Sequence, residues 1–224
     1  MFQIRIHGRG GQGVVTAAEL IAIAAFNDGK QAQAFPSFGV ERTGAPIEAY
    51  ARIDDKPIRT REHVYKPNVL IIQDSTLLET VDVAHGCDKN TLVIINTAKT
   101  KSEIKQQGVN LPEKNIYSAP VKQSSKKNKN FSERNYEKLL KRCGVYPIDA
   151  TKIALEIIGK NLVNTVILGA FAKVAGLVSL SSLEKAIKQK FGEKGGEIVD
   201  KNIKAIKKAF CCYVYFHKDV MLIY

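Results

Sequence analysis

The stretch FQIRIHGRGGQGVVTAAELIAIAAF, residues 2–26, decides the fold. Residues 2–6 alternate apolar and polar side chains, which is typical of a β-strand. The glycines that begin at Gly8 are expected to end this strand, and residues 14–26 form an Ala-rich apolar run without proline, which predicts a buried helix. A strand, a glycine-rich loop and a helix in this order are typical of the start of an α/β domain.

The rest of the chain continues the alternation of strands and helices. Short apolar runs predict strands at 31–35, 47–53, 69–73, 91–96 and 145–148, and longer periodic runs predict helices at 149–158, 163–175, 183–191 and 194–210. Strands made of solid apolar runs are usually covered on both faces. We therefore expect a three-layer α/β/α sandwich, Rossmann-like, with a mostly parallel central sheet. The alternating pattern near Ile47 also allows a mixed sheet.

Length and composition favour one globular domain over residues 1–224. Hydrophobic residues make up 45% of the chain and charged residues 25%, which excludes wholesale disorder. No apolar run approaches the roughly 20 residues that a membrane span needs, so no membrane partner is expected. The N-terminus carries Arg5 and early glycines in place of a signal peptide, so we expect a cytoplasmic protein.

Two regions depart from this order. Residues 118–142 hold eight basic and two acidic side chains, a large part of the net charge of +12, and we interpret them as a basic, flexible insertion. Because this insertion explains much of the charge, a nucleic-acid partner is not expected. Residues 210–224 form an atypical C-terminal tail, for which an extra edge strand, a partner-facing segment and a gene-model artefact all stay open.

The cysteines do not form a metal-binding pattern. Cys87, Cys143, Cys211 and Cys212 include no CxxC pair, and their spacing fits neither an iron–sulfur cluster nor a structural zinc site. The histidines are scattered as well. We therefore expect reduced thiols and no metal site in this chain.

The loop after the first strand is the first candidate binding site. It satisfies the GxGxxG pattern, in which glycines allow close backbone approach and the helix N-terminus attracts an anion. A glycine turn that serves only strand–helix packing explains the pattern equally well, so both interpretations stay open. The second strand is followed by no acidic residue before Glu41, which argues against dinucleotide binding. The candidate residues are Gly8, Arg9, Gly10, Gly11, Gln12 and Gly13.

The segment 37–46, SFGVERTGAP, is the second candidate. An arginine between glycines can present a bidentate donor to a phosphate or carboxylate, or it can form a salt bridge with the neighbouring glutamate that only holds the loop. Loops at the carboxyl ends of parallel strands share one crevice, so the loops after Gly8, Phe35, Asp74 and Asn96 should converge there. The candidate residues of this segment are Phe38, Gly39, Glu41, Arg42 and Gly44, and no catalytic residue is expected.

Four motifs in the same order resemble a known family. The glycine loop with Val14–Ala18, the segment Ser37–Pro46, the run Asp149–Ala154 and the run Asn164–Phe171 resemble the gamma subunit (domain III) of pyruvate:ferredoxin oxidoreductase, of the 2-oxoacid:ferredoxin oxidoreductase superfamily. The likeness covers about residues 1–97 and 145–209. The insertion and the tail depart from it.

The resemblance implies a division of labour among subunits. It implies a complex that converts pyruvate and coenzyme A to acetyl-CoA and CO₂ and reduces ferredoxin. Thiamine diphosphate, magnesium and iron–sulfur clusters would belong to alpha, beta and ferredoxin-like delta partners, and this chain would hold no cofactor alone. The gamma chain would supply an assembly surface and part of the coenzyme A approach.

Two alternatives remain at this stage. The first is the gamma subunit of a branched-chain 2-oxoacid:ferredoxin oxidoreductase, which has similar motifs. The second, from a different class, is a stand-alone Rossmann-like nucleotide-binding protein. Co-purification with larger partners would separate the second alternative from the oxidoreductase subunits.

Overall fold

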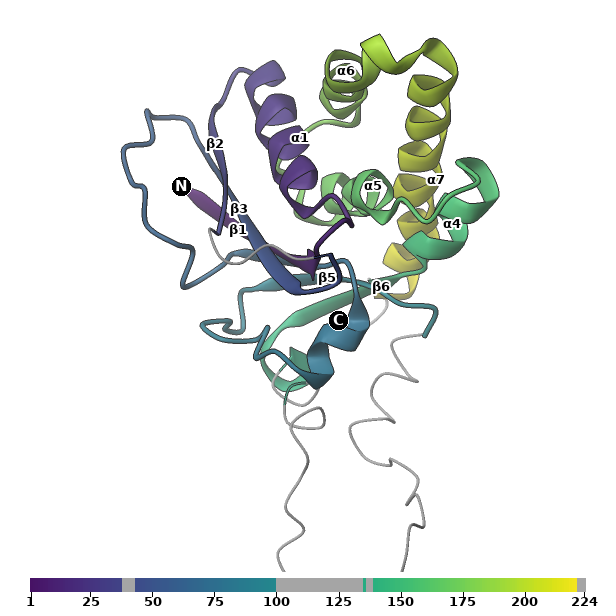
Figure 1. Ribbon diagram of the computed structural model, residues 1–224. Coiled ribbons are helices and arrows are strands. Elements are labelled where there is room, and N and C mark those ends of the chain that lie inside the picture. The colour runs from purple at the N-terminus through teal and green to yellow at the C-terminus, as the bar shows by residue number, and fades with distance from the viewer. Residues whose placement is uncertain (38–42, 100–134, 136–138, 221–224) are drawn as a thin grey trace, which may run out of the picture.

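A six-stranded mixed sheet organises the molecule (Figure 1). The computed structural model describes residues 1–37, 43–99, 135 and 139–220. Neighbouring strands follow the order β2-β3-β1-β4-β5-β6. Strands β1, β4, β5 and β6 run parallel to one another, whereas β3 is antiparallel to both of its neighbours. The strands are β1 (Phe2–Arg9), β2 (Gln31–Pro36), β3 (Pro46–Asp54), β4 (Val69–Ile72), β5 (Leu92–Asn96) and β6 (Gly144–Ile148). The expected α/β class and mostly parallel sheet are confirmed.

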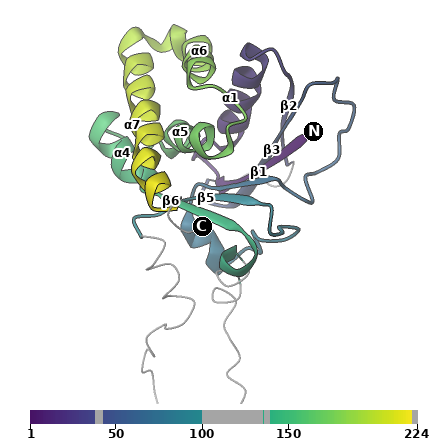
Figure 2. The same ribbon diagram turned by 180° about the vertical axis from the view of Figure 1, so that it is seen from behind.

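The long helices gather on one face of the sheet, as both views show (Figures 1 and 2). This helical face holds the larger hydrophobic core, in which Ile4, Ile71 and Phe171 are completely buried. The helices are α1 (Val14–Asn27), α4 (Ala150–Ile157), α5 (Val163–Ala175), α6 (Leu180–Phe191) and α7 (Gly196–Val220), with the 3₁₀ turn η2 (Gly192–Lys194) between the last two.

The opposite face carries a smaller core. The 3₁₀ helix η1 (Ser75–Glu79) and the irregular residues 80–91 cover β4 and β5 there. Leu77, Leu78 and Val93 are buried in this second cluster. Within the described residues, the third layer of the sandwich is thus mostly irregular chain.

Strand β1 is longer than its sequence predicts. The glycine at position 8 was expected to end it, but Gly8 pairs with Ile47 and Arg9 pairs with Pro46. The antiparallel ladder with β3 supplies hydrogen-bond partners that outweigh the low strand propensity of glycine. The glycine loop therefore begins only after Arg9.

The two atypical regions differ from expectation where they are described. Helix α7 continues to Val220, so the edge-strand interpretation is wrong for residues 210–220, and the last four residues lie outside the described part of the chain. Most of residues 118–142 lies outside the described residues. At its end, however, Asn135 and Leu139 are 1% and 2% exposed, and Leu139 joins the smaller core. Asn135 and Leu139 are therefore packed and not exposed, whereas Lys141 and Arg142 at the end of the segment are exposed.

Candidate functional site

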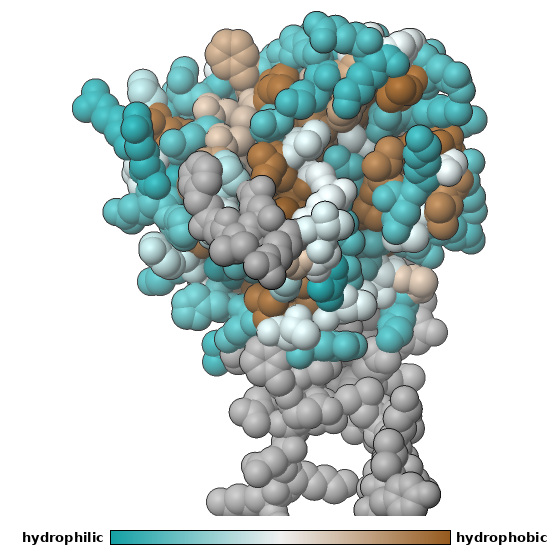
Figure 3. Space-filling view, in the orientation of Figure 1, coloured by the Kyte–Doolittle hydropathy of each residue, from teal (hydrophilic) through white to brown (hydrophobic). Residues whose placement is uncertain are grey.

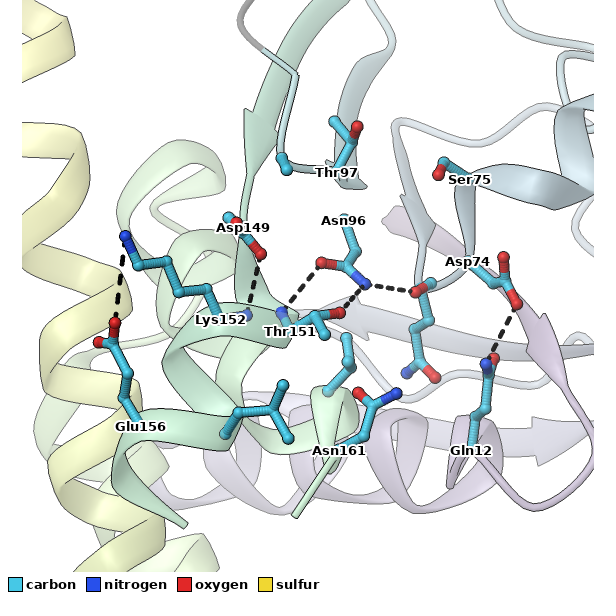
Figure 4. Close-up of a pocket in the computed structure, with 14 residues that line it drawn as sticks. Gln12, Asp74, Ser75, Asn96, Thr97, Asp149, Thr151, Lys152, Glu156 and Asn161 are labelled. Atoms are coloured by element: carbon cyan, nitrogen blue, oxygen red, sulfur yellow. Dashed lines mark hydrogen bonds and ion pairs between the residues drawn. The ribbon is translucent and has the colours of Figure 1, made fainter. Parts of the chain in front are cut away.

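A crevice of about 610 Å³ opens at the carboxyl ends of β1, β4, β5 and β6 (Figure 4). Parallel strands bring their following loops to the same edge, which is where open α/β sheets bind ligands. The expected convergence of the glycine loop with the loops after β4 and β5 is confirmed. The polar side chains around the crevice are Gln12, Gln73, Asp74, Ser75, Asn96, Thr97, Asp149, Thr151, Lys152, Glu156 and Asn161.

Asp74 connects the glycine loop to the end of β4. Its carboxylate accepts from Arg9 Nε at 2.9 Å, from Gln12 Nε2 at 3.2 Å and from the Thr76 hydroxyl at 2.6 Å. Partial burial raises the pKa of Asp74, but the hydrogen bonds from Thr76 and Gln12 and the charge of Arg9 outweigh it and hold this pKa below its usual value. One wall of the crevice therefore carries a fixed negative charge that is already paired.

Asn96 holds the ends of β4, β5 and α4 together. Its Nδ2 donates to the Gln73 carbonyl and to the Thr151 hydroxyl, each at 2.9 Å, and its Oδ1 accepts from the Thr151 N–H at 3.2 Å. Asp149 caps α4 by accepting from the Lys152 N–H at 2.9 Å. Figure 4 shows these side chains along one side of the crevice. This side of the crevice is therefore a polar network held by hydrogen bonds.

The side-chain amide of Gln73 is the unsatisfied group of the site. Gln73 lines the crevice and is 1% exposed, yet neither its Oε1 nor its Nε2 has a hydrogen-bond partner among the residues that the structure describes. A buried amide without partners costs free energy comparable to a lost hydrogen bond. A ligand in the crevice that offers one donor and one acceptor would satisfy it.

Close packing explains two of the four glycines at positions 8–13. Gly13 has φ +70°, and a Cβ there would lie 2.4 Å from Asn164 Nδ2 on α5. A Cβ on Gly8 would lie 2.5 Å from the Val14 side chain. The packing interpretation therefore holds for these two positions. Helix α1 nevertheless starts without a side-chain cap at Gly13, so its first turn keeps donors for an anion.

Two further candidate groups, the Gly10 N–H and the Arg9 side chain, are engaged within the protein. The Gly10 N–H donates to the Ala45 carbonyl at 2.9 Å, so it is not available to a ligand as the anion interpretation required. The guanidinium of Arg9 donates to Asp74, to the Gly44 carbonyl at 3.1 Å and to the Thr76 hydroxyl at 2.8 Å. Arg9 is therefore a structural clamp between loops.

The second candidate segment is described only in part. Phe38, Gly39, Glu41 and Arg42 lie outside the described residues. Gly44 has φ +82°, and its N–H donates to the Gly10 carbonyl at 3.0 Å, so the two candidate loops touch each other.

Sequence reasoning missed three crevice residues as site residues: Gln73, Asp149 and Thr151. Gln73 and Asp149 directly follow the parallel strands β4 and β6, and Thr151 lies in the first turn of the helix that Asp149 caps, so position after a strand was a usable signal for the first two. Among the described residues, no group of three or more His, Cys, Asp or Glu side chains could hold a metal ion. None of the described helices combines the length and apolar character needed to cross a bilayer.

The fold and this crevice together define the class of the protein, which is a Rossmann-like α/β protein with a polar crevice at its strand ends. The family model for pyruvate ferredoxin/flavodoxin oxidoreductase matches residues 3–212, and the chain belongs to this family. The resemblance seen in the motifs is therefore confirmed.

Similar proteins in sequence and in structure belong to the same family. The chain is 46% identical over 211 residues to the pyruvate/ketoisovalerate oxidoreductases common subunit gamma of Thermococcus kodakarensis, covering 94% of this chain and 96% of the relative. It is 45% identical over 210 residues to pyruvate synthase subunit PorC of Methanothermobacter marburgensis, with the same coverage. The crystal structure of pyruvate oxidoreductase subunit PORC from Thermotoga maritima superposes with a TM-score of 0.67 at 31% identity, covering 93% and 94% of the two chains.

Proposed function

We propose that this chain is the gamma subunit of a pyruvate:ferredoxin oxidoreductase, which converts pyruvate and coenzyme A to acetyl-CoA and CO₂ and reduces ferredoxin. The observation that carries the proposal is the match over 94% of the chain to relatives named as gamma and PorC subunits. Thiamine diphosphate, magnesium and iron–sulfur clusters are assigned to alpha, beta and delta partners. The chain itself contributes assembly surface and a contact to coenzyme A.

The sheet order argues against a stand-alone dinucleotide-binding protein. In that class the second strand lies beside the first and carries the acid that holds the ribose. Here β3 separates β2 from β1, and β2 ends in Phe35-Pro36 without an acid. A ribose at the glycine loop would find no carboxylate from the second strand.

The relative from Thermococcus bears a name that assigns it to both a pyruvate and a ketoisovalerate enzyme. A gamma chain shared in this way does not select the 2-oxo acid. We therefore assign substrate choice to the partner subunits, and the branched-chain alternative differs from the main proposal only in those partners.

Exposed apolar side chains beside the crevice support an assembly role. Leu155 on α4 is 53% exposed at the crevice, and Leu162, just before α5, is 40% exposed. The surface in Figure 3 is mostly hydrophilic, and apolar patches interrupt it over the helices. Apolar groups at such a rim are suited to a partner subunit.

Purification from the native host tests the subunit assignment. We expect the tagged chain to elute with larger partners, iron and thiamine diphosphate, and the complex to reduce a dye in a pyruvate- and coenzyme A-dependent manner. Leu155→Asp should reduce the yield of complex, whereas Ile198→Asp, which changes a 43% exposed residue on α7, should not. A chain that elutes alone, or that reduces the dye by itself, would overturn the assignment.

The unsatisfied amide of Gln73 provides the test of the coenzyme A contact. In the assembled enzyme, Gln73→Leu should raise KM for coenzyme A about tenfold, the loss of roughly one hydrogen bond, while KM for pyruvate stays unchanged. Gln189→Leu on the remote helix α6 is the matched control and should change neither constant. An unchanged KM for coenzyme A in the Gln73 variant would refute the contact and leave the subunit assignment standing.

A further inference from the structure

Most of the connection between β3 and β4, residues 55–66, lies over the sheet face opposite the helices, and we call it the β3–β4 segment. Two buried arginines of the sheet hold its backbone. Arg52 donates to the Glu62 carbonyl, and Arg5 Nη1 donates to the Val64 carbonyl at 3.2 Å. Arg52 is completely buried and Arg5 is 5% exposed. Because hydrogen bonds from charged donors are stronger than those between neutral groups, these two anchors fix the path of the segment.

Ring contacts and one close approach fix the end of the segment. The His63 ring lies 5.2 Å from the ring of Tyr50, which is 2% exposed, and the Tyr65 ring lies 6.3 Å from that of His63. A Cβ on Gly86 would collide with the Tyr65 carbonyl oxygen, so only glycine allows the segment to pack this closely. The β3–β4 segment is therefore ordered before any partner binds.

The exposed side chains of this ordered segment are mostly cations. Lys56, Arg59, Arg61 and Lys66 are all exposed, and none of them forms an ion pair with another described residue. Among them stands Tyr65, whose large ring is 61% exposed. The segment thus presents unpaired positive charge and an aromatic ring to the surroundings on a fixed backbone.

We propose that the β3–β4 segment binds an acidic surface of a partner subunit, an inference that rests on the assignment of this chain as one subunit of a larger enzyme. Tyrosine and arginine are enriched at protein interfaces and supply much of their binding energy. A segment that is already fixed loses little conformational entropy on binding. Carboxylates of the partner complement the unpaired cations of the segment.

The charges of the segment favour a protein over other anionic partners. Asp55 and Glu62 are exposed among the cations, and they would repel the phosphates of a nucleic acid or of a lipid surface. A protein surface can place a cation opposite each of them. A second copy of this chain is disfavoured, because its net charge of +12 would oppose pairing.

The proposed interface lies away from the crevice. Strand β3 ends beside the start of β1, where Ile53 pairs with Phe2, and β4 starts near the same edge, where Val69 pairs with Ile4. The crevice opens at the other ends of the parallel strands. A subunit on the β3–β4 segment therefore leaves the crevice accessible, and charge changes in the segment should leave KM for coenzyme A unchanged in the complex that survives.

Charge reversal in the tagged chain, purified from the native host, tests the interface. We expect Arg59→Glu/Arg61→Glu to lower the yield of partner subunits per tagged chain at least about fivefold at about 0.15 M salt. The control Lys185→Glu/Lys188→Glu makes the same change of charge at two exposed residues of α6 and should retain the partners. Equal yields from the two double variants, whether high or low, would refute a specific interface at the segment.

The outcomes separate this interface from the subunit assignment. Partners that stay bound to Arg59→Glu/Arg61→Glu refute the interface alone, whereas an unchanged chain that elutes without partners refutes the subunit assignment. Nuclease treatment of the lysate should not alter the yield. Partners lost after nuclease would mean that a nucleic acid occupies the segment, which overturns the proposal.

Zero-length cross-linking of the unchanged complex needs no substitution, so a folding defect cannot affect it. A water-soluble carbodiimide joins a lysine to a carboxylate only where the two are in contact. We expect mass mapping to find Lys56 or Lys66 linked to an Asp or Glu of a partner subunit. Links to partners from Lys185 or Lys188, with none from the β3–β4 segment, would place the interface on α6 and contradict the proposal.

Discussion

The two faces of the sheet are covered differently, and β1 and β3 contribute side chains to both. On the helical face, β1 and β3 present Ile4, Ile6 and Ala51, which are completely buried in the larger core. On the opposite face the same strands present Arg5 and Arg52, which are buried almost as fully. Because side chains alternate along a strand, neighbouring residues of β1 and β3 experience these two environments in turn.

The difference follows from what covers each face. A helix pairs its own carbonyls, so the helical face needs only apolar contact. Irregular chain has free carbonyls that need donors. Arg52 donates to the carbonyls of Thr60 and Glu62, and Arg5 donates to those of Val64 and Val83. On this face the buried arginine side chains therefore donate the hydrogen bonds that a helix would provide to its own carbonyls.

The largest effect is expected for a cavity in the helical face. Phe171 on α5 is completely buried, and Phe171→Ala should lower the free energy of unfolding by about 3–5 kcal/mol in denaturant titrations. Phe26→Ala, at a position 71% exposed on α1, is the control and should cost about 0.5 kcal/mol or less. Similar losses in both variants would show that the helical face is not one packed core.

The matching change on the opposite face is Arg52→Met. It keeps apolar volume but leaves the Thr60 and Glu62 carbonyls without their donor, so the free energy of unfolding should fall by about 2–4 kcal/mol. Arg59→Met, in the same covering segment but exposed, should change it by less than about 0.5 kcal/mol. A fully stable Arg52→Met protein would mean that apolar packing alone closes this face.

A buried histidine on the opposite face predicts that the stability of the protein depends on pH. Burial, opposed by the charge of Glu48, lowers the pKa of His7 from 6.5 to about 4. Below pH 6.5 the unfolded chain binds a proton that the folded chain refuses, so stability should fall by about 2–3 kcal/mol between pH 6.5 and 4. The variant His7→Gln should lose this part of the slope in denaturation at several pH values, whereas Phe171→Ala should retain it. A slope unaffected by His7→Gln would contradict a neutral buried imidazole.

The smallest effects on stability are expected for two glycine variants, which test how closely α5 packs against α7. A Cβ on Gly169 would lie 2.2 Å from the Ile206 carbonyl, so Gly169→Ala should force α5 and α7 apart and cost about 1–3 kcal/mol. Gly192 has helical backbone angles and no atom near its missing Cβ, so Gly192→Ala should stabilise by about 0.4–1 kcal/mol. Thermal melts of the two variants should therefore shift in opposite directions, and shifts of the same sign would contradict the close crossing.

Part of the site was accessible from the sequence. Asp74 lies two residues after β4, and Asn96 is the last residue of β5. Parallel strands place such residues at one edge, so their convergence could be predicted. The roles of the glycine-loop residues could not. Whether Arg9 is free for a ligand depends on Asp74 and Gly44, which reach it only through the sheet and the loop before β3.

The sequence by itself determined the local elements, because hydrophobic period, glycine and proline act over a few residues. Helix α5 spans the predicted residues 163–175, since nearly every side in this run is apolar and Gly176 follows it in a left-handed conformation. Tertiary structure alone decided that β3 separates β2 from β1 and that Arg52 is buried. These outcomes depend on contacts between distant segments, and no local pattern records which distant segment will supply a carbonyl or a strand edge.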